Sequence, residues 1–267
     1  MVREPLVTTA DGRLPDAFAG IRARLDESVS PGEQMPAGDL AGYLATGESA
    51  LKAIRLALLA ARAPEPKRVL DLPCGHGRVL RWLAAAFPEA ELTACDLLTD
   101  GVDFCAATFG ARPIHSVPEP DPSLFGAHYD LIWVGSLLTH LDAPAWDRFL
   151  ALFDALLAPG GVLVVTTHGE LVAERMRQGH HYGYPPTLIA RALRTYDHAG
   201  FSFLEESPTN IDYGITIARP AWVVDRLTRH PSLRLALYAE ALWANHQDVV
   251  AVVKRANDPD AANRPYT

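Results

Sequence analysis

The stretch VLDLPCGHGRVL, residues 69–80, is the part of the sequence that decides the fold. Apolar residues lead into Asp71, a turn containing Gly75 and Gly77 follows, and a helical pattern begins at once. This order predicts a buried strand whose backbone turns sharply beneath a bound small molecule. The next apolar run, ELTACD, ends at Asp96, where a carboxylate can accept hydrogen bonds from ribose hydroxyls. The stretch therefore predicts a cofactor that contains a nucleoside.

Strand-like and helix-like segments alternate on both sides of this turn. The predicted strands are residues 67–72, 91–97, 112–117, 129–135 and 161–167, and the predicted helices between them are residues 77–87, 100–110 and 143–158. The strands are short, continuous apolar runs, which are typical of a parallel sheet covered on both faces. Alternating strands and helices joined by right-handed crossovers predict an α/β fold with a doubly wound sheet.

The segments before and after this region are less regular. Residues 1–38 are rich in Pro, Gly and Asp and form a predicted N-terminal extension, and helical spacing predicts a helix over residues 39–62. The other predicted elements are a short helix at residues 18–25, a helix at residues 186–198, and strands at residues 200–207 and 246–255. Residues 207–245 are too long for a hairpin loop and predict an insertion with two helices separated by Pro231. The predicted division is therefore the extension and one domain at residues 39–267.

Composition limits the classes of partner. The 267 residues are 49% hydrophobic, enough for a sizeable core, and carry a formal net charge of −8. The cations are scattered arginines without a basic run, so long-range electrostatics disfavours nucleic acid and anionic membrane. The cysteines, Cys74, Cys95 and Cys105, are odd in number, which favours a reduced, cytoplasmic protein without a disulfide framework. No signal peptide is expected, and no apolar run approaches the roughly 20 residues that span a bilayer.

Two cofactor classes use a strand, a glycine turn and a helix in this order. A dinucleotide fold requires G-x-G-x-x-G, whose third glycine permits close packing of the helix. Gly75 and Gly77 match the first two positions, but Leu80 occupies the third and Arg78 lies where the helix begins. This departure disfavours NAD or FAD, and a nicotinamide oxidoreductase stays the less favoured alternative.

Residues 40–255 instead resemble the class I S-adenosylmethionine-dependent methyltransferases. The first motif of that family ends in G-x-G-x-G and matches VLDLPCGHG, with Pro73 in place of the first glycine. Asp96 matches the family's acidic ribose ligand, YDLIWVGSLLTHL the fourth-strand motif, and LLAPGGVLVVTTHG the signature before the fifth strand. The resemblance implies S-adenosylmethionine as the cofactor. The cofactor-binding residues that it implies are Asp71, Pro73, Gly75, Gly77, Asp96, Leu97 and Gly135.

The same resemblance implies a Rossmann-like seven-stranded sheet with a parallel sixth strand and an antiparallel seventh. Ligands of open α/β sheets bind at the carboxyl edge of the strands. The insertion at residues 207–245 is therefore expected to form a helical cap over the active site, and the helix around Tyr43–Leu59 to cover it from the other side. The combined CGHGR, THG and NHQDV pattern is associated with bacterial enzymes of glycan or secondary metabolism.

Three histidines are the candidate catalytic residues. His140 follows the fourth predicted strand, His168 follows the fifth, and His246 begins the last strand. A histidine near its ordinary pKa can accept the proton of a hydroxyl, although each ring can equally be a structural side chain. The weaker candidates, for contact with the substrate, are Tyr43, Tyr213 and Asn245.

No metal site is predicted. His180 and His181 are adjacent in a segment rich in Gly and Tyr, which favours a surface lid, and adjacent side chains do not direct both rings to one metal ion. The sequence also offers no convincing set of acidic ligands for a metal-dependent mechanism.

The predicted function is methyl transfer to a small molecule, with a hydroxyl of a sugar or natural product as the favoured acceptor. The reaction is an in-line displacement, in which the enzyme mainly orients the reactants and excludes water. The sequence leaves open that the chain binds the cofactor as a noncatalytic partner. It also allows a homo-oligomer.

Overall fold

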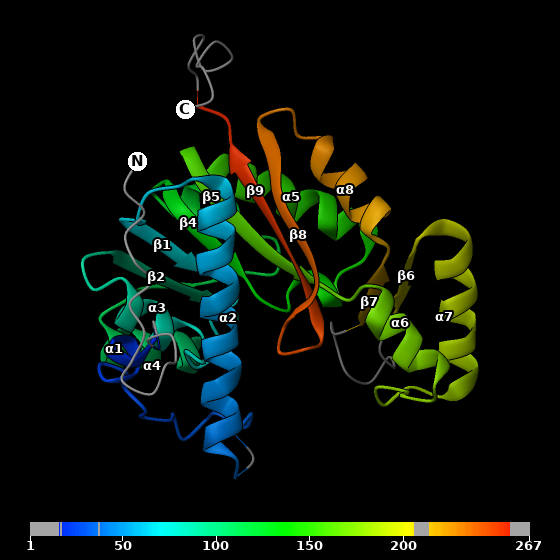
Figure 1. Ribbon diagram of the computed structural model, residues 1–267, viewed down its shortest axis with the longest axis horizontal. Coiled ribbons are helices and arrows are strands. Elements are labelled where there is room, and N and C mark those ends of the chain that lie inside the picture. Colours follow the sequence, from blue (N-terminus) through cyan, green and yellow to red (C-terminus); the bar gives the residue numbers. More distant parts are fainter. Residues whose placement is uncertain (1–15, 17, 37, 206–213, 257–267) are drawn as a thin grey trace, which may run out of the picture.

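A computed structural model describes residues 16, 18–36, 38–205 and 214–256, and a mixed sheet forms its centre (Figure 1). Seven strands make up this sheet in the order β3-β2-β1-β4-β5-β9-β8. They are β1 (Arg68–Asp71), β2 (Glu91–Asp96), β3 (Arg112–His115), β4 (Tyr129–Val134), β5 (Leu157–Thr167), β8 (Leu233–Trp243) and β9 (Gln247–Lys254). β1 to β5 are parallel, and β9 runs antiparallel to both of its neighbours. The predicted α/β fold with one antiparallel strand is confirmed.

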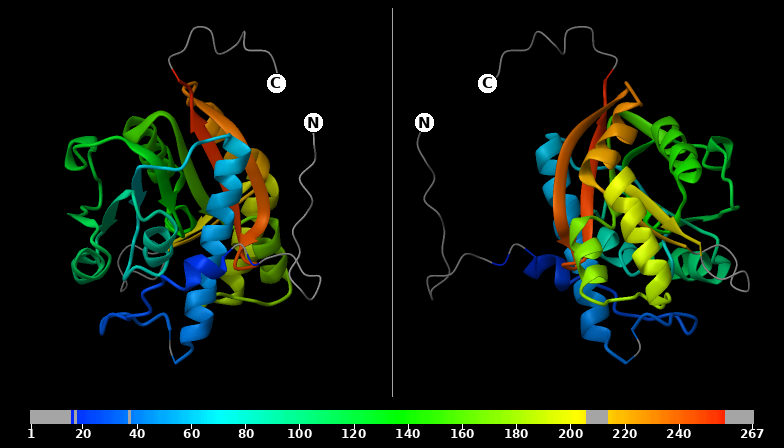
Figure 2. Two further views of the ribbon diagram at one scale, coloured as in Figure 1. Left: turned by 60° about the vertical axis from the view of Figure 1, so that its left-hand side comes forward. Right: turned by 90° about the vertical axis from the view of Figure 1, so that its right-hand side faces the viewer.

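Helices cover both faces of the sheet, and each face has its own apolar cluster. α2 (Leu40–Ala61), α3 (Leu80–Ala86) and α4 (Thr99–Phe109) bury apolar side chains on one face. α5 (Ala143–Leu156) and α8 (Pro220–Thr228) do so on the other face. Figure 2 shows α2 running alongside β8 and β9. The other helical elements are α1 (Ala19–Arg22), η1 (Pro122–Leu124), η2 (Leu138–His140), α6 (Glu170–Arg177) and α7 (Pro186–Ala199).

Local signals define both ends of the long helix α2. The side chain of Asp39 accepts a hydrogen bond from the N–H of Gly42 at 2.8 Å and caps the first turn. Arg62 adopts a left-handed conformation with a φ of 56°, which ends the helix. The helix predicted over residues 39–62 is thus confirmed.

The segment after Pro231 differs from the prediction of a second helix. It forms β8, which pairs antiparallel with β9 and therefore runs parallel to β1–β5. Its sequence is rich in Leu and Ala, which suit a helix. However, β9 is buried along most of its length, and its outward N–H and C=O groups need partners. Pairing with β9 therefore decides the structure of this segment, and β8 takes the place of the sixth strand.

The segment predicted as the sixth strand lies outside the main sheet. β6 (Phe201–Leu204) pairs with β7 (Ile215–Ala218) in a separate two-stranded antiparallel sheet. These strands, α6 and α7 share an apolar cluster of their own. Together they form a lobe beyond the carboxyl end of β5 (Figure 1), which we call the α6–β7 lobe.

The α6–β7 lobe, and not a pair of helices within residues 207–245, extends beyond the carboxyl edge of the sheet. Of that stretch the structure describes residues 214–245, and the single helix there is α8. This helix packs against α5, with the rings of Trp222 and Trp146 centred 5.1 Å apart. The prediction of two helices is therefore wrong for the described part of the stretch. The domain division at residue 38 stays a prediction.

Candidate functional site

The loop after β1 begins with an acid that has no partner. Asp71 is 1% exposed, and within the part of the chain that the structure describes neither of its carboxylate oxygens accepts a hydrogen bond. Burial, with a contribution from the nearby Asp96 carboxylate, raises the pKa of Asp71 well above its ordinary value. A buried, unpaired acid is costly, so a cationic ligand group beside Asp71 would stabilise it.

Pro73 does not disturb this loop, because its neighbours supply the hydrogen bonds. The N–H of Leu72 donates to the carbonyl of Trp133 in β4, and the N–H of Cys74 donates to the carbonyl of Cys95 in β2, each at 3.0 Å. The loop is thereby fixed to both strands that flank β1. The residue between the two donors needs no N–H of its own.

Gly75 and Gly77 have different reasons to be glycine. Their φ angles are 50° and 81°, a region that side chains disfavour. A Cβ on Gly77 would lie 2.5 Å from the ring of Phe109, so this glycine permits close packing against α4. A Cβ on Gly75 would meet no atom within 4 Å. Gly75 therefore faces open space, where a ligand can approach the loop backbone.

Asp96, at the end of β2, holds the loop and borders the same space. Its Oδ2 accepts from the N–H of Gly75 at 2.7 Å, and its Oδ1 accepts from the N–H of Leu98 at 3.0 Å. Each carboxylate oxygen has a second lone pair, so ribose hydroxyls can still bind. Leu97 and Leu98 follow with 50% and 48% of their surfaces exposed, which offers an apolar surface to a flat base.

A half-buried cation lies close to the unpaired Asp71. Burial lowers the pKa of Arg78, and the surrounding Tyr43, Glu33 and Asp71 act in the opposite direction. The guanidinium lies 5.7 Å from the ring centroid of Trp243 and, among the described residues, forms neither an ion pair nor a hydrogen bond. A ligand with both an ammonium and a carboxylate group would pair with Asp71 and Arg78 together. The amino-acid end of S-adenosylmethionine is such a group, so these residues fit the expected cofactor.

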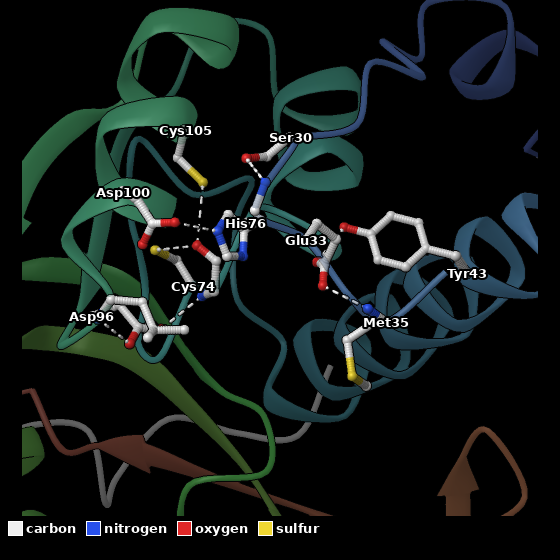
Figure 3. Close-up of polar contacts among 12 residues, drawn as sticks. Ser30, Glu33, Met35, Tyr43, Cys74, His76, Asp96, Asp100 and Cys105 are labelled. Carbon is white, nitrogen blue, oxygen red and sulfur yellow. Dashed lines mark hydrogen bonds and ion pairs between the residues drawn. The ribbon is translucent and has the colours of Figure 1, made fainter. Parts of the chain in front are cut away.

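Residues 26–36, which we call the N-terminal segment, lie across this loop (Figure 3). Arg81 is 1% exposed and donates to the carbonyl oxygens of Asp26 at 3.0 Å, Ser28 at 2.9 Å and Gly77 at 3.1 Å. Gly32, in the same segment, packs against the side chains of His76 and Asp100. One buried guanidinium thus joins the N-terminal segment to the loop after β1, residues 72–79, which we call the cofactor loop.

His76 and Asp100 contact this segment on the side of α4. Nε2 of His76 lies 3.1 Å from Oδ2 of Asp100, and a Cβ on Gly32 would lie only 2.6 Å from the same carboxylate oxygen. On the side of α2, the hydroxyl of Tyr43 donates to Oε2 of Glu33 at 3.0 Å (Figure 3). The segment therefore has fixed contacts on both sides of the loop.

A polar network joins the carboxyl ends of the central strands. The N–H of Ser136 donates to Oγ1 of Thr166 at 2.8 Å, and Thr166 donates to Oε1 of Gln247 at 2.5 Å. The amide of Gln247 donates back to the hydroxyl of Ser136 at 2.7 Å. Gly135 precedes this network, and a Cβ there would lie 2.8 Å from the indole nitrogen of Trp133. The chain after β4 is thus held close to both β5 and β9.

The structure brings the three predicted catalytic histidines together beside this network. The rings of His168 and His246 are centred 5.1 Å apart at an angle of 64°, and His140 is close enough to influence the charge of His168. They come from η2, from the residue after β5 and from the residue before β9. Since β1, β4 and β5 are neighbours, this cluster lies two strand spacings, about 10 Å, along the edge from the cofactor loop.

The hydrogen bonds of two rings define their tautomers. Nδ1 of His168 lies 3.2 Å from the carbonyl oxygen of Thr216, and a carbonyl can only accept. The proton of His168 is therefore on Nδ1, and Nε2 is an acceptor. Nδ1 of His246 lies 2.8 Å from the guanidinium of Arg175, which can only donate. The proton of His246 is therefore on Nε2.

Both of these rings are neutral at physiological pH. Burial, with smaller effects of His246 and His140, lowers the pKa of His168 to about 3. Burial and the nearby Arg175 lower the pKa of His246 as well. The pair thus presents one hydrogen-bond acceptor and one donor near the sheet edge.

Two further residues belong to the cluster, Arg175 on α6 and Tyr182 in the loop after it, and Arg175 was not predicted from the sequence. The ring of Tyr182 is centred 5.8 Å from that of His246 and 6.4 Å from that of His168. Arg175 also donates to the carbonyl oxygen of Asn245 at 2.9 Å. The amphipathic spacing of the segment that forms α6 is the signal that could have placed Arg175 on the face turned away from the lobe's core.

The weaker candidates occupy different places. Tyr43 lies beside Arg78 and Arg81 at the cofactor loop, and not with the three histidines. Asn245 contributes its backbone carbonyl to Arg175, and its side chain is exposed. Tyr213 lies outside the described residues.

Other kinds of site are not found in the described residues. No group of three or more His, Cys, Asp or Glu side chains in those ranges could hold a metal ion. Across the same ranges, no helix combines the length and apolar character that crossing a bilayer requires. Cys74, Cys95 and Cys105 are buried and form no disulfide.

Comparisons with known proteins agree with this architecture. Residues 43–203, more than half of the chain, match the family described as a methyltransferase domain. A fatty-acid O-methyltransferase from Mycolicibacterium smegmatis is 33% identical over 109 residues, which are 38% of this chain and 37% of that protein. A trans-aconitate 2-methyltransferase from Streptomyces avermitilis is 30% identical over 190 residues, 64% of this chain and 67% of that protein. The matched part spans about a third of the length of the first curated relatives.

A solved structure has the same fold at low identity. It is 1,6-didemethyltoxoflavin-N1-methyltransferase from Burkholderia thailandensis with bound 1,6-didemethyltoxoflavin and S-adenosylhomocysteine. The two chains are 15% identical, with a TM-score of 0.52 over 78% of each chain. At this identity the match shows a shared fold.

Proposed function

Because the chain belongs to the methyltransferase domain family, we propose that it transfers a methyl group from S-adenosylmethionine to a hydroxyl oxygen of a small molecule. The observation that carries this choice of acceptor is the pair of neutral imidazoles. Nε2 of His168 can only accept a hydrogen bond, and Nε2–H of His246 can only donate one. A hydroxyl group is both donor and acceptor, so it satisfies both rings at once.

The residues around the loop after β1 would hold the cofactor. Asp71 would bind its ammonium group and Arg78 its carboxylate, while Asp96 would accept from the ribose and Leu97 would pack against the adenine. When bound, the cofactor supplies a methyl group activated by the positive charge on sulfur. The neighbour of the same fold from Burkholderia thailandensis holds S-adenosylhomocysteine, which supports this assignment.

The protein's own contribution is orientation and the transfer of one proton. The acceptor oxygen must lie in line with the bond between the methyl group and sulfur, and the two imidazoles would hold it there. As the new C–O bond forms and the C–S bond breaks, the hydroxyl proton passes to Nε2 of His168. The low pKa of His168 does not prevent this step, because the methylated oxonium is a far stronger acid than an imidazolium. The positive charge thus leaves sulfur and ends on the imidazole.

The alternatives have less support. A noncatalytic cofactor-binding partner would be favoured by a disturbed first motif, but the loop around Pro73 is hydrogen-bonded to β2 and β4. A nicotinamide oxidoreductase does not agree with the family. One of the relatives is an O-methyltransferase by name, the fatty-acid enzyme from Mycolicibacterium smegmatis, which supports oxygen as the acceptor atom.

Formation of S-adenosylhomocysteine with a panel of small hydroxyl compounds tests the proposal. We expect turnover by the native protein, and His168→Gln should lower kcat by about 100-fold while leaving the affinity for S-adenosylhomocysteine unchanged. His246→Gln should raise KM more than it lowers kcat, because this ring donates a hydrogen bond and takes no proton. His180→Gln, an exposed residue of the neighbouring loop, is the matched control. Equal rates for all variants would exclude the histidine pair as the acceptor site.

A further inference from the structure

We propose that the acceptor is a hydroxy acid, whose carboxylate binds Arg175 while its hydroxyl lies between His168 and His246. This inference rests on the proposed function and adds the chemical class of the substrate. The observation behind it is that the guanidinium of Arg175 lies beside the acceptor site and has only uncharged partners.

The contacts of Arg175 are all with neutral groups. One terminal nitrogen donates to Nδ1 of His246 at 2.8 Å, and the other donates to the carbonyl oxygen of Asn245 at 2.9 Å. The guanidinium also faces the hydroxyl of Tyr182. Arg175 has five N–H groups, so donors remain for a further ligand.

Two other arginines in or beside the α6–β7 lobe have acidic partners. Arg177 donates to Oδ1 of Asp197 at 2.7 Å, and Arg219 lies 3.5 Å from Oε1 of Glu170. Arg175, by contrast, has no carboxylate oxygen within 4.0 Å among the described residues. A partly buried cation without a counter-ion is unfavourable, and an anionic ligand would remove that cost.

Nearby acids do not compete for this position. Asp248 is buried, and its two oxygens accept from the hydroxyl of Tyr238 at 2.6 Å and from the N–H of Ala241 at 2.9 Å. Glu170 lies against Arg219 instead. Neither acid therefore supplies the negative charge that would balance Arg175, and a bound ligand can supply it.

A carboxylate suits the site better than a phosphate monoester. Arg175 supplies one positive charge, and His246 and His168 are neutral, so a single negative charge balances the cluster. The planar guanidinium also matches the planar carboxylate.

The geometry limits the distance between the two groups of the substrate. The ring of His246 stands between Arg175 and the proposed hydroxyl position, because Nδ1 faces the guanidinium and Nε2–H faces the hydroxyl. With an ordinary hydrogen bond at each end, the carboxylate lies at least about 5 Å from the hydroxyl oxygen. A hydroxy acid with both groups on one carbon is too short, whereas a para-substituted aromatic ring has the required span.

Calorimetric titration of the protein saturated with S-adenosylhomocysteine tests the inference with four probes. They are 4-hydroxybenzoate, its neutral amide, the shorter 2-hydroxybenzoate and 4-hydroxyphenyl phosphate. We expect 4-hydroxybenzoate to bind about 30-fold more tightly than the amide and more tightly than the other two probes. Arg175→Gln should remove the preference for the acid over the amide, and Arg175→Lys should retain part of it.

Arg177→Gln is the matched control, because Arg177 is on the same helix and already pairs with Asp197. Equal binding of the acid and the amide by the native protein would overturn the inference, as would failure of all the acids to bind. A preference that survives Arg175→Gln, or that Arg177→Gln removes equally, would also overturn it. Tighter binding of the phosphate would assign a divalent anion instead of a carboxylate.

The same titrations separate this inference from the proposed function. If neutral phenols are methylated and Arg175→Gln has no effect, only the hydroxy-acid assignment fails. If 4-hydroxybenzoate binds through Arg175 but no hydroxyl compound yields S-adenosylhomocysteine, the proposed methyl transfer fails and the anion site stands.

Discussion

The two ends of the carboxyl edge of the sheet are built in different ways. The loop after β1, which would hold the cofactor, consists of residues close in sequence, together with the end of the adjacent strand β2. The histidine cluster is assembled from η2, the residue after β5, α6 and the turn before β9, which are far apart in the sequence. A local motif can therefore identify the first site, whereas the second exists only once the chain has folded.

The two sites also differ in how their charges are balanced. Asp71 and Arg78 have opposite charges and lie near each other, but neither forms an ion pair among the described residues. At the other site, Arg175 has neutral partners and two imidazoles with low pKa values lie beside it. The first arrangement suits a zwitterion and the second suits an anion, so the two halves should respond differently to substitution.

The largest difference is expected between two glycines of the cofactor loop. Gly77→Ala should lower the free energy of unfolding by about 3 kcal/mol, because its Cβ would collide with Phe109 at a positive φ. Gly75→Ala should cost only about 1 kcal/mol of stability, since its Cβ meets open space. It should nevertheless lower the affinity for S-adenosylhomocysteine about 100-fold. Denaturant unfolding and calorimetry measure both effects, and a loss of affinity no greater for Gly75→Ala than for Gly77→Ala would show that the cofactor does not lie against Gly75.

The histidine cluster should make the protein sensitive to acid. The pKa of His168 is about 3 in the folded protein and near its ordinary value of 6.5 in the unfolded chain. The unfolded chain therefore binds the proton first, so stability is complete above pH 6.5 and is lost as the pH falls toward 3. By pH 4 the loss from this group is about 3 kcal/mol. Unfolding curves at pH 7, 5.5 and 4 should show a shallower decline for His168→Asn, and parallel declines would mean that His168 is not buried as a neutral ring.

Replacing the unpaired acid should lower the affinity for the ligand and raise the stability of the cofactor-free protein. Asp71→Asn should lower the affinity for S-adenosylhomocysteine about 30-fold, or about 2 kcal/mol, because the ammonium group loses its counter-charge. The same change should stabilise the cofactor-free protein at pH 7 by about 1 kcal/mol, since it removes a buried charge next to Asp96. Asp100→Asn is the control, because Asp100 is exposed and already paired with His76. A less stable Asp71→Asn protein would indicate that the acid has a partner in solution.

The smallest expected effect concerns the other end of the zwitterion. Arg78→Gln should weaken binding of S-adenosylhomocysteine about tenfold, or about 1.4 kcal/mol, because the ligand carboxylate loses an ionic hydrogen bond. Binding of 5′-methylthioadenosine, which has no amino-acid group, should not change. Arg68→Gln, an exposed substitution at the amino end of β1, serves as the control. An equal loss for both ligands would place Arg78 outside the carboxylate contact.

The cofactor loop could be predicted from the sequence more fully than the histidine cluster, because its residues are close together in the chain. The first motif predicted the strand, the turn and the positions of Asp71, Gly75 and Gly77, because each depends on neighbours a few residues away. Asp96 was predictable as well, since its strand lies next to β1. The convergence of His140, His168 and His246 could be expected only from the positions of strand ends in a doubly wound sheet, and their roles stay predictions.

The parts that the sequence did not predict depend on tertiary pairing. The segment that forms β8 has a helical composition and is a strand because β9 needs a partner. Arg175 lies in a segment whose polar, glycine-bearing sequence favours a loop, and the helix α6 forms there because it packs inside the α6–β7 lobe. Tyr43 was expected near the substrate, but the N-terminal segment brings its hydroxyl to Glu33 beside the cofactor loop. Cytoplasmic location, homo-oligomerisation and a role in secondary metabolism stay predictions.

The contacts of Arg81 have a consequence for how related sequences can vary. Its guanidinium binds main-chain oxygens at positions 26 and 28, so almost any side chain is compatible with the contact at those two places. The side chains at those positions can therefore vary during evolution while the arginine keeps the segment in place. A comparison of sequences would find only an invariant arginine without a visible partner.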